Sequence, residues 1–566
     1  MTQWTLLTSF FRKYTGKLIL TLFVGTLSSI TTILLPISIG KFYALVFHFE
    51  GKRSVLFDIF PTTLYDTVPH FILLFFVFIT LNTIMNYLQR YLASSVGELL
   101  IYEIRNKLFK HQVKLGTKVY EEKGTGKYLL RYSGDLKSIQ NYLTKGIIGF
   151  STDLLLIGFI IVALASISPL ITIISVTALL GMIIPISLLN QQLHTTSIKR
   201  RNKKAGLLSF VSQRLQSINT IKGFNRDLIE QNKFSKRSSS IYSVGLQFHH
   251  ISSLIFILIP ALLYSMIGLI MYAIYWQQNQ GTIIDQEGLL AAFLLLMTML
   301  PIFRRSLRIV QTWKLGKISM NKLLNVMSLP YEDQYEKPSI DIKKPSLQIK
   351  SVSFRYDDTV IFKGLSAQWN TNGLHLILGG TGSGKSCLAK LLLGMYSNYQ
   401  GQILLAGKDI SQYTIKSLRR HITIISHDFP LLGKTVFEAI SYSRKEHKRL
   451  TAYNVLESLQ LALPLSARLD LDDPIGNQGS KLSKGQKQVL LVARALLTKK
   501  PIILIDYPFS DTGSEIKKQV IQHIQKLRSK RTILLFSQQH IDTQLAYDTV
   551  TNLDDFQEHI HQKQSA

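Results

Sequence analysis

Cysteine and charged side chains are scarce in this 566-residue chain. Its one cysteine, Cys387, excludes an intrachain disulfide and favours a reducing compartment. Charged residues make up 18% of the chain and hydrophobic residues 46%, whereas a soluble domain carries about 25% charged residues. We therefore expect part of the chain to lie in lipid.

Acidic residues are scarcer than basic ones, with 35 Asp and Glu against 65 Lys and Arg, which gives a net charge of +30. Such an excess can indicate nucleic-acid binding. Basic residues crowded into the cytoplasmic loops of a membrane protein produce the same excess, and this interpretation is favoured, so no nucleic-acid partner is expected. Residues 1–17 do not form a cleavable signal peptide, because their basic residues lead into a long apolar span without a small-residue cleavage site.

Six stretches are long and apolar enough to cross a bilayer, which takes about 20 residues each, and they lie near 18–46, 70–93, 146–166, 168–190, 251–276 and 287–311. The connections 101–145 and 191–250 carry 10 and 11 Lys and Arg, whereas 46–69 carries two and 276–287 none. By the positive-inside rule, the N-terminus, both long connections and everything after the sixth span are cytoplasmic. The chain is expected to be a multi-pass protein of the plasma or inner membrane.

From about residue 345 the pattern changes to short β-branched runs that alternate with helical segments. Examples are 374–378, 422–425 and 502–505. This alternation predicts an α/β domain with a largely parallel sheet. The segment 326–344, which contains Pro330 and Pro338, is the expected linker between the two parts.

A glycine-rich loop follows the strand 374–378 and opens a helix at 388–393. Glycines let backbone N–H groups wrap phosphates at a helix N-terminus, the lysine reaches the β- and γ-phosphates, and the serine hydroxyl binds Mg²⁺. Because the loop lies between a predicted strand and a predicted helix, it is interpreted as a Walker A nucleotide-binding loop. The ATP-binding set is Gly379, Gly380, Thr381, Gly382, Ser383, Gly384, Lys385, Ser386 and Cys387, the last being most simply a packing residue.

Two further motifs follow the loop. The apolar run 502–506 ends in Asp506, the Walker B arrangement, so Ser386 and Asp506 are the expected Mg²⁺ ligands. Between the two Walker motifs lies a serine- and glycine-containing pentapeptide before a helical segment, and its serine and helix N-terminus offer donors to a phosphate. In this position it resembles the signature of ABC transporters, with Ser483, Lys484, Gly485 and Gln486.

The chain is similar to ABC transporters of the exporter type over nearly its whole length. This resemblance implies an all-α transmembrane domain of six helices (1–325), the linker 326–344, and an α/β P-loop ABC nucleotide-binding domain (345–566). It also implies ATP-driven export with ATP and Mg²⁺ as cofactors. Tyr356 matches the aromatic residue that stacks on adenine in the family, although an ordinary strand aromatic is an alternative.

Three positions of the phosphate pocket depart from the family pattern. The general base is normally a glutamate directly after the Walker B aspartate, but here that residue is Tyr507, and a phenol with a pKa of about 10 is a poor base for water. The family's Q-loop glutamine matches His427. Its switch histidine matches Gln538, unless His540 replaces it. The resemblance therefore implies a degenerate site that binds ATP and hydrolyses it slowly.

In the family, nucleotide is held between the Walker A loop of one chain and the signature of the other. Because the signature here is intact, the chain is expected to complete the competent site of a second, non-identical half-transporter that has the catalytic glutamate. A nucleotide-gated channel or a regulatory subunit is the alternative function. A soluble DNA-repair ATPase of the same class is excluded by the six spans.

The transported substrate is not specified by the sequence, and membrane lipid is the surrounding partner. Few ionisable residues occupy the centres of the spans, which favours apolar or amphipathic cargo. Asn82, Asn86 and Gln89 share one helical face of the second span. They either line a substrate cavity or form hydrogen bonds between helices.

Overall fold

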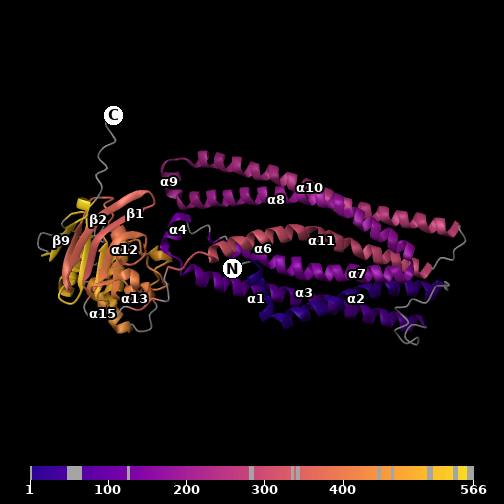
Figure 1. Cartoon of the computed structure of the whole chain (residues 1–566), viewed down its shortest axis with the longest axis horizontal. Helices are drawn as coiled ribbons and strands as arrows, with labels where there is room; N and C mark the ends of the chain where they lie inside the picture. Colours follow the sequence, from indigo (N-terminus) through magenta and orange to yellow (C-terminus); the bar gives the residue numbers. More distant parts are fainter. Residues whose placement is uncertain are drawn as a thin grey trace. The chain divides into compact units, whose positions relative to one another are not determined.

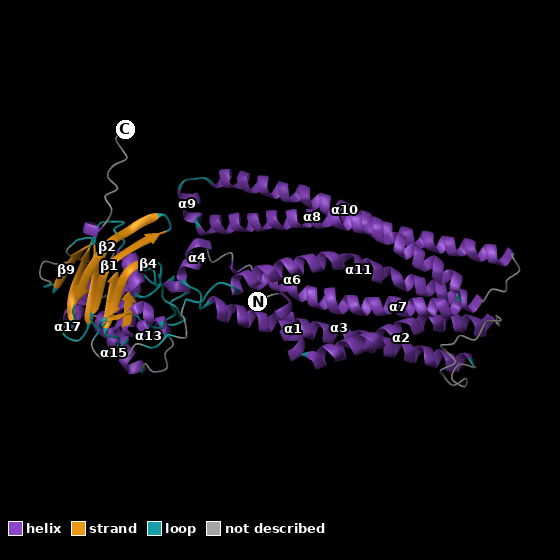
Figure 2. Cartoon of the chain, viewed as in Figure 1, coloured by secondary structure: helices purple, strands orange, loops and turns teal. Residues whose placement is uncertain are grey.

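The chain divides into two compact units. The first comprises residues 1–112 and 126–329, and the second comprises 113–125 and 330–566. The computed structural model describes residues 3–47, 67–123, 128–129, 131–279, 286–332, 337–339, 345–442, 448–460, 465–506, 514–539 and 546–556. Figures 1 and 2 show a helical unit and a unit with mixed helices and strands, so the fold class predicted from the sequence is confirmed.

Over its described residues, the first unit contains six helices that are long and apolar enough to span a membrane, at Thr15–Phe47, Val68–Gln112, Arg131–Ile167, Pro169–Gln216, Asp227–Asn279 and Gly288–Met327. These helices are α2 (Thr15–Phe47), α3 (Val68–Gln112), α7 (Phe150–Ile167) with the segments before it, α8 (Pro169–Gln216), α10 (Asp227–Asn279) and α11 (Gln286–Met327). Two shorter helices are α1 (Gln3–Lys13) and α9 (Ile218–Gly223).

The third span is irregular at its start. A π-helix, η2 (Arg131–Asp135), is followed by α6 (Leu136–Asn141) and by a second π-helix, η3 (Tyr142–Gly149), which runs into α7. The span ends at Ser168, whose side chain accepts a hydrogen bond from the amide of Ile171, and Pro169 begins α8. Serine at an N-cap and proline at the first helical position are both favoured at a helix start. The third and fourth spans therefore meet at a tight turn.

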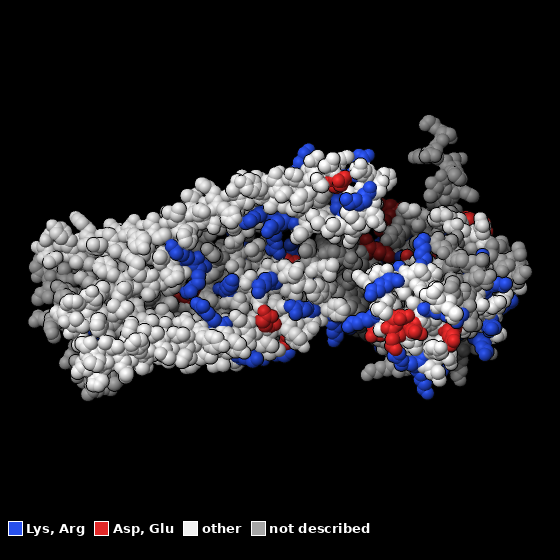
Figure 3. All heavy atoms as spheres, turned by 180° about the vertical axis from the view of Figure 1, so that it is seen from behind, with Lys and Arg blue, Asp and Glu red and all other residues white. Residues whose placement is uncertain are grey.

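Apolar side chains hold the helical unit together. One cluster joins α2, α3, α7, α10 and α11 and includes Ile37, Phe78, Ile160, Met266 and Leu295. A second cluster joins α8 and α10, which run side by side in Figure 1. Figure 3 shows Lys and Arg gathered over one part of this unit and a white, uncharged stretch over the other. This distribution matches the charge asymmetry of the loops.

The second unit contains two sheets. The first is antiparallel in the order β2-β1-β4-β5, with strands Thr359–Trp369, Leu347–Tyr356, Tyr399–Leu405 and Lys408–Asp409. The second is parallel in the order β6-β7-β8-β3-β9, with strands Ile422–Ile425, Ile502–Asp506, Thr532–Ser537, Gly373–Leu378 and Thr549–Asn552. Its helices are α12 (Lys385–Leu392), α13 (Ile415–His421), α14 (Val436–Ser441), α15 (Arg449–Gln460), α16 (Lys484–Leu497) and α17 (Ser514–Leu527).

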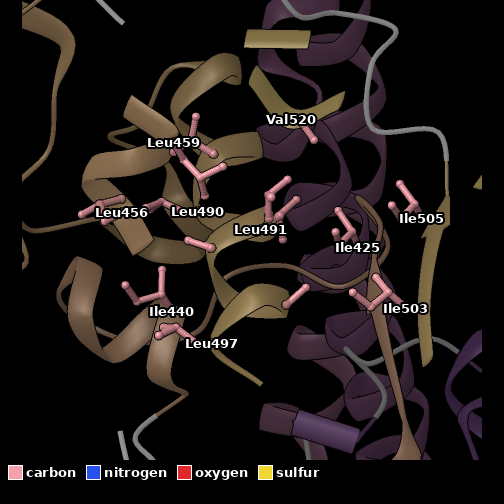
Figure 4. Packing of buried hydrophobic residues seen from close by; sticks show 14 of the residues in the cluster. Ile425, Ile440, Leu456, Leu459, Leu490, Leu491, Leu497, Ile503, Ile505 and Val520 are labelled. Carbon is pink, nitrogen blue, oxygen red and sulfur yellow. The ribbon is translucent and has the colours of Figure 1, made fainter. Parts of the chain in front are cut away.

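The parallel sheet is buried on both faces. Along β7, Ile503 and Ile505 belong to one apolar cluster, whereas Ile502 and Leu504 belong to another. Successive side chains of a strand point to opposite faces, so a strand covered on both sides is apolar throughout. Figure 4 shows Ile503 and Ile505 among side chains of the first cluster, which also contains residues of α14, α15, α16 and α17.

Helix α4 (Thr117–Lys123) belongs to the second unit, although it lies between two spans in the sequence. An isolated bridge pairs Leu115 with Tyr331, and the amide of Glu332 donates to the carbonyl of Lys114 at 2.9 Å. The first cytoplasmic connection therefore contributes a short helix to the nucleotide-binding part of the chain.

Candidate nucleotide site

All five strands of the parallel sheet contribute to one edge. The glycine-rich loop follows β3 and Asp506 ends β7, while His427, Gln538 and Asp554 follow β6, β8 and β9. Carboxyl ends of parallel strands lie at one edge of a sheet, which is where open α/β sheets bind ligands. The sheet topology therefore brings together residues that are far apart in the sequence, such as Gly379 and Asp554, which are 175 residues apart.

The glycine-rich loop requires glycine at specific positions. Gly382 and Gly384 have φ angles of +86° and +89°, which side chains rarely adopt. A β-carbon on Gly384 would also lie 2.5 Å from Ile361 and 2.7 Å from the ring of Phe362. The loop then leads directly into α12, so its backbone N–H groups and the helix N-terminus face the same place.

Lys385 closes the loop on itself. Its Nζ donates to the carbonyls of Gly379 and Gly380 at 2.7 and 2.6 Å. Burial lowers the pKa of this ammonium group, and the carboxylates of Asp554 and Asp506 oppose the shift. The lysine is thus a partly desolvated cation that backbone carbonyls hold, which suits it to meet an anionic phosphate.

Ser386 and Asp506 lie together. The Ser386 hydroxyl donates to Asp506 Oδ2 at 2.9 Å, and the Ser426 hydroxyl donates to the same oxygen at 3.4 Å. Burial raises the pKa of Asp506, against the effect of the Ser386 hydrogen bond. A hydroxyl and a carboxylate in contact are oxygen donors of the kind that Mg²⁺ prefers. The loop, its lysine and this oxygen pair together fit a nucleotide phosphate with its metal ion.

Two of the departures from the family pattern, His427 and Gln538, are described by the structure, and both lie at this edge of the parallel sheet. His427 lies in an exposed turn directly after β6. The Gln538 amide donates to the Thr381 hydroxyl at 3.1 Å, so this side chain contacts the glycine-rich loop. Tyr507 and His540 lie outside the described residues.

Tyr356 lies at the end of β1 and contacts α4. Its hydroxyl donates to Glu121 at 3.1 Å, and its ring meets the ring of Tyr396 edge-on, with centroids 5.9 Å apart. Tyr396 also donates to Glu121, at 3.0 Å. The aromatic predicted to stack on adenine is therefore anchored through its hydroxyl to a helix from the first cytoplasmic connection.

Lys390 links this group to the His427 turn. Its Nζ lies 3.2 Å from Glu121 and 3.3 Å from Asp428. Burial alone would raise the pKa of Glu121, but hydrogen bonds from Lys390 and Tyr396 hold it below its ordinary value. Glu121 is therefore ionised at neutral pH and connects α4 to two segments at the edge of the site.

The signature pentapeptide begins α16 with a capping box. The Ser483 hydroxyl oxygen accepts from the Gln486 amide at 3.2 Å, and the Gln486 side chain accepts from the Ser483 amide at 2.8 Å. Because the Ser483 oxygen acts as an acceptor here, its proton stays available for another acceptor. Ser483 and Lys484 are exposed and Gly485 is partly buried, so the helix start is accessible.

Three contributors were not predicted. Glu121 and Lys390 lie 269 residues apart and meet only in the fold. Asp554, which accepts from the Gly380 amide at 3.1 and 3.0 Å, follows a four-residue strand near the end of the chain. An aspartate two residues after a short strand and a lysine in the helix after the glycine-rich loop match no motif. The sequence therefore offered no signal for these contacts.

Comparison with known proteins identifies both parts of the chain. Residues 18–300, half of the chain, match the ABC transporter transmembrane region, and residues 362–510 match the ABC transporter domain. The chain belongs to the ABC transporter family. With one membrane region and one ATPase domain, it is a half-transporter of the exporter type.

Relatives agree with this assignment. The chain is 23% identical over 469 residues to an ATP-dependent lipid A-core flippase of Mannheimia succiniciproducens, covering 81% of this chain and 80% of that protein. A flippase of the same description from Francisella novicida is also 23% identical, covering 81% and 79%. A bacterial Atm1-family ABC exporter with ATP bound superposes with a TM-score of 0.80 at 19% identity, covering 96% of this chain and 94% of that one.

The predicted enzyme class and location are thereby confirmed. This ABC transporter chain is an ATP-hydrolysing, multi-pass membrane protein, and its nucleotide-binding part is cytoplasmic. ATP binding follows from the ABC transporter domain. The roles of the individual site residues stay predictions.

Proposed function

We propose that this chain is one subunit of a heterodimeric ATP-driven exporter. Its own pocket binds Mg-ATP with the loop 379–387 and hydrolyses it slowly, with Ser386 and Asp506 holding the metal ion. Its signature completes the competent site of a different half-transporter. Tyr356 contributes the adenine contact.

One contrast within the chain carries this proposal. The glycine-rich loop, Lys385 and the Ser386–Asp506 pair have the arrangement that phosphate and metal binding need. The position that should supply the base for water is Tyr507 instead of glutamate. General-base catalysis is worth about 10²–10⁴-fold, so this pocket retains binding and loses most of its rate.

The signature supports the second half of the proposal. Ser483 caps α16 through its oxygen and keeps a proton to donate, and Gly485 leaves room for a phosphate to approach the helix start. Two copies of this chain would form two slow sites. A partner with glutamate after its Walker B aspartate would form one fast site against this signature.

The cargo is proposed to be lipid-like and amphipathic. The lipid A-core flippases that resemble this chain act on lipid, and the spans carry few ionisable residues at their centres. A transporter for such cargo needs a cavity open to the bilayer and a polar place for the headgroup.

The decisive experiment compares two positions in this chain within the complex that it forms with its partner. Gly485→Asp and Ser483→Arg put charge or bulk where the partner's phosphate must approach, and loss of such a donor costs about 10²–10³-fold. Lys385→Ala affects only the slow pocket, so it should leave most of the ATPase rate. Steady-state phosphate release at saturating Mg-ATP measures the ATPase rate of the complex for the signature variants and for Lys385→Ala.

Nucleotide binding controls for misfolding. Gly485→Asp should still bind nucleotide at the chain's own pocket, whereas Lys385→Ala should bind it more weakly. An inactive Lys385→Ala complex with an active Gly485→Asp complex would show that this pocket does the chemistry. Equal losses would show two coupled, competent sites. Single-channel conductance in place of substrate-stimulated ATPase would favour the channel alternative.

A further inference from the structure

A cavity of about 380 Å³ lies within the helical unit. Residues of α2, α3, η3, α7 and α11 line it, and most of these residues have polar side chains, with hydroxyls and amides such as those of Ser28, Thr32, Asn86 and Gln89. The polar face that the sequence suggested for α3 therefore serves two purposes. Asn82 Oδ1 accepts from Thr31 and Thr32 between helices, at 3.2 and 3.1 Å, whereas Asn86 and Gln89 face the cavity.

Three cations and one carboxylate also line this cavity, namely Arg90, Lys145, Arg305 and Asp153. Arg305 pairs with Asp153 at 2.7 Å. Among the described residues, neither Arg90 nor Lys145 has a carboxylate within 4 Å, and both side chains are exposed to solvent in the isolated chain. The cavity wall thus carries a net charge of +2, in a unit whose spans have few ionisable residues at their centres.

The cations lie at two depths. Arg90 and Lys145 come from the cytoplasmic ends of the second and third apolar stretches, 70–93 and 146–166. Asp153 follows Lys145 by eight residues, roughly 12 Å along a helix at 1.5 Å per residue. Long basic side chains near span ends often extend to the headgroup region. Here they converge on one polar cavity and continue inward to the Arg305–Asp153 pair.

A distorted helix holds Lys145 in place. Lys145 lies in η3, and π-helical segments inside α-helices are frequent at functional sites. This segment packs closely on α11, because Trp313 Nε1 donates to the carbonyl of Gly146 at 2.7 Å, and Tyr142 lies against Gly316 without room for a β-carbon. The backbone of Lys145 is therefore held in place by the packing of Tyr142 and Gly146, which lie before and after it in the chain.

We propose that this cavity binds the phosphate headgroup of an amphiphilic cargo. Arg90 and Lys145 make the first contacts, and Arg305 joins them by exchanging Asp153 for the phosphate. Asp153 holds Arg305 in the absence of cargo and limits how tightly the anion binds, which a transporter needs for release. The inference rests on the proposed function only in taking the cargo to be amphiphilic.

The test measures binding to the purified full-length chain in maltoside micelles. The probe is a short-chain phosphatidic acid with a fluorophore on one tail, read by anisotropy, beside the diacylglycerol with the same tails. Loss of one charged hydrogen bond costs about 1.5–3 kcal/mol, so Arg90→Gln and Lys145→Gln should each weaken phosphatidic acid binding by roughly ten- to a hundredfold. Asp153→Asn should strengthen it several-fold, because a competing carboxylate is lost.

Matched controls separate the site from general charge effects. Arg105→Gln removes a charge from an exposed position of the same helix, outside the cavity, and should leave binding unchanged. Arg90→Lys should retain most of the affinity. None of the variants should change binding of the diacylglycerol.

Three outcomes would overturn the proposal. Equal affinity for phosphatidic acid and diacylglycerol would mean that the cavity ignores charge. Equal losses in Arg90→Gln and Arg105→Gln would mean that the cavity is not the binding place. Inorganic phosphate displacing the probe at the probe's own Kd would identify a soluble anion instead of an amphiphile. The assay needs neither ATP turnover nor the partner, so it can fail while the heterodimer proposal holds, and the reverse.

Discussion

Gly146 packs against Trp313 in η3, the segment that also contributes Thr144, Lys145, Ile148 and Gly149 to the cavity wall. A β-carbon there would lie 2.7 and 2.9 Å from the indole of Trp313, which already donates to the Gly146 carbonyl. Such distances require the ring or the helix to move. Glycine is therefore required at this position of η3 by packing, and the same segment carries Lys145.

Replacing Gly146 by alanine should destabilise the helical unit by about 1–3 kcal/mol, as overpacking does. The variant should also weaken binding of the anionic probe, because η3 would shift. Thermal unfolding of the full chain in micelles and the anisotropy assay measure the two effects.

Gly158 provides the matched control on the following helix α7. A β-carbon at Gly158 meets nothing within 4 Å, and alanine is favoured over glycine in a helix by about 1 kcal/mol. Gly158→Ala should therefore unfold at the same temperature or higher. If both variants behave alike, the close contact with Trp313 does not position η3.

Helix α4 contacts side chains at the edge of the nucleotide site. Its Glu121 receives hydrogen bonds from Tyr356, Lys390 and Tyr396. The same helix forms a second ion pair, Lys118 with Asp357, at 3.7 Å between exposed side chains. Exposed pairs of this kind contribute little. Glu121 thus attaches α4 to the rest of its unit through three polar side chains.

Glu121→Gln should loosen α4 by about 1 kcal/mol, roughly a fivefold faster local hydrogen exchange, after allowance for the partial exposure of the site. Lys118→Gln should change exchange hardly at all. Exchange of the α4 amides in the full chain, followed by mass spectrometry, compares the two. Equal exchange in Glu121→Gln and wild type would show that apolar packing alone holds this helix.

Hydrogen exchange of α4 with Mg-ATP bound provides a second test of the Glu121 contact. If Tyr356 stacks on adenine, the Tyr356–Glu121 contact connects the nucleotide to α4, and Mg-ATP should slow α4 exchange in wild type more than in Glu121→Gln. This experiment tests a contact within one chain, so its result does not depend on which partner subunit is present.

Across the whole molecule, the cytoplasmic parts of the long helices expose apolar side chains. Leu208 and Leu215 of α8 are 63% and 64% exposed, and Phe224 and Leu228 near α9 are 73% and 69% exposed. These positions follow the strongly basic stretch 199–204, beyond the apolar span, so lipid does not account for them. Exposed apolar groups of this kind mark protein contacts, which fits a chain that works as half of a pair.

A chain that works only as half of a pair should be slow by itself. The purified full chain should bind Mg-ATP and release phosphate well below about 1 s⁻¹, the lower end of ordinary enzyme rates. Adding the partner half-transporter should raise the rate by orders of magnitude. A rate of 1 s⁻¹ or more from the chain alone, free of the partner, would contradict the slow-site proposal.

The sequence by itself determined the features that depend on neighbouring residues. Hydropathy over about 20 residues gave the six spans, and loop charge gave their orientation, because the bilayer acts on each segment separately. The glycine-rich loop was recognisable because backbone conformation and helix dipole are local. Even the tyrosine at position 507, where the family usually has glutamate, could be recognised from its place directly after Asp506.

Only the tertiary structure decided which distant side chains meet. Glu121 with Tyr356, Asp554 with the Gly380 amide, and the convergence of Arg90, Lys145 and Arg305 each depend on how separate helices and strands pack. The same is true of η3, whose distortion accompanies tight contact with α11. Packing is set by the shapes of all the surfaces together, so no spacing along one chain segment encodes it.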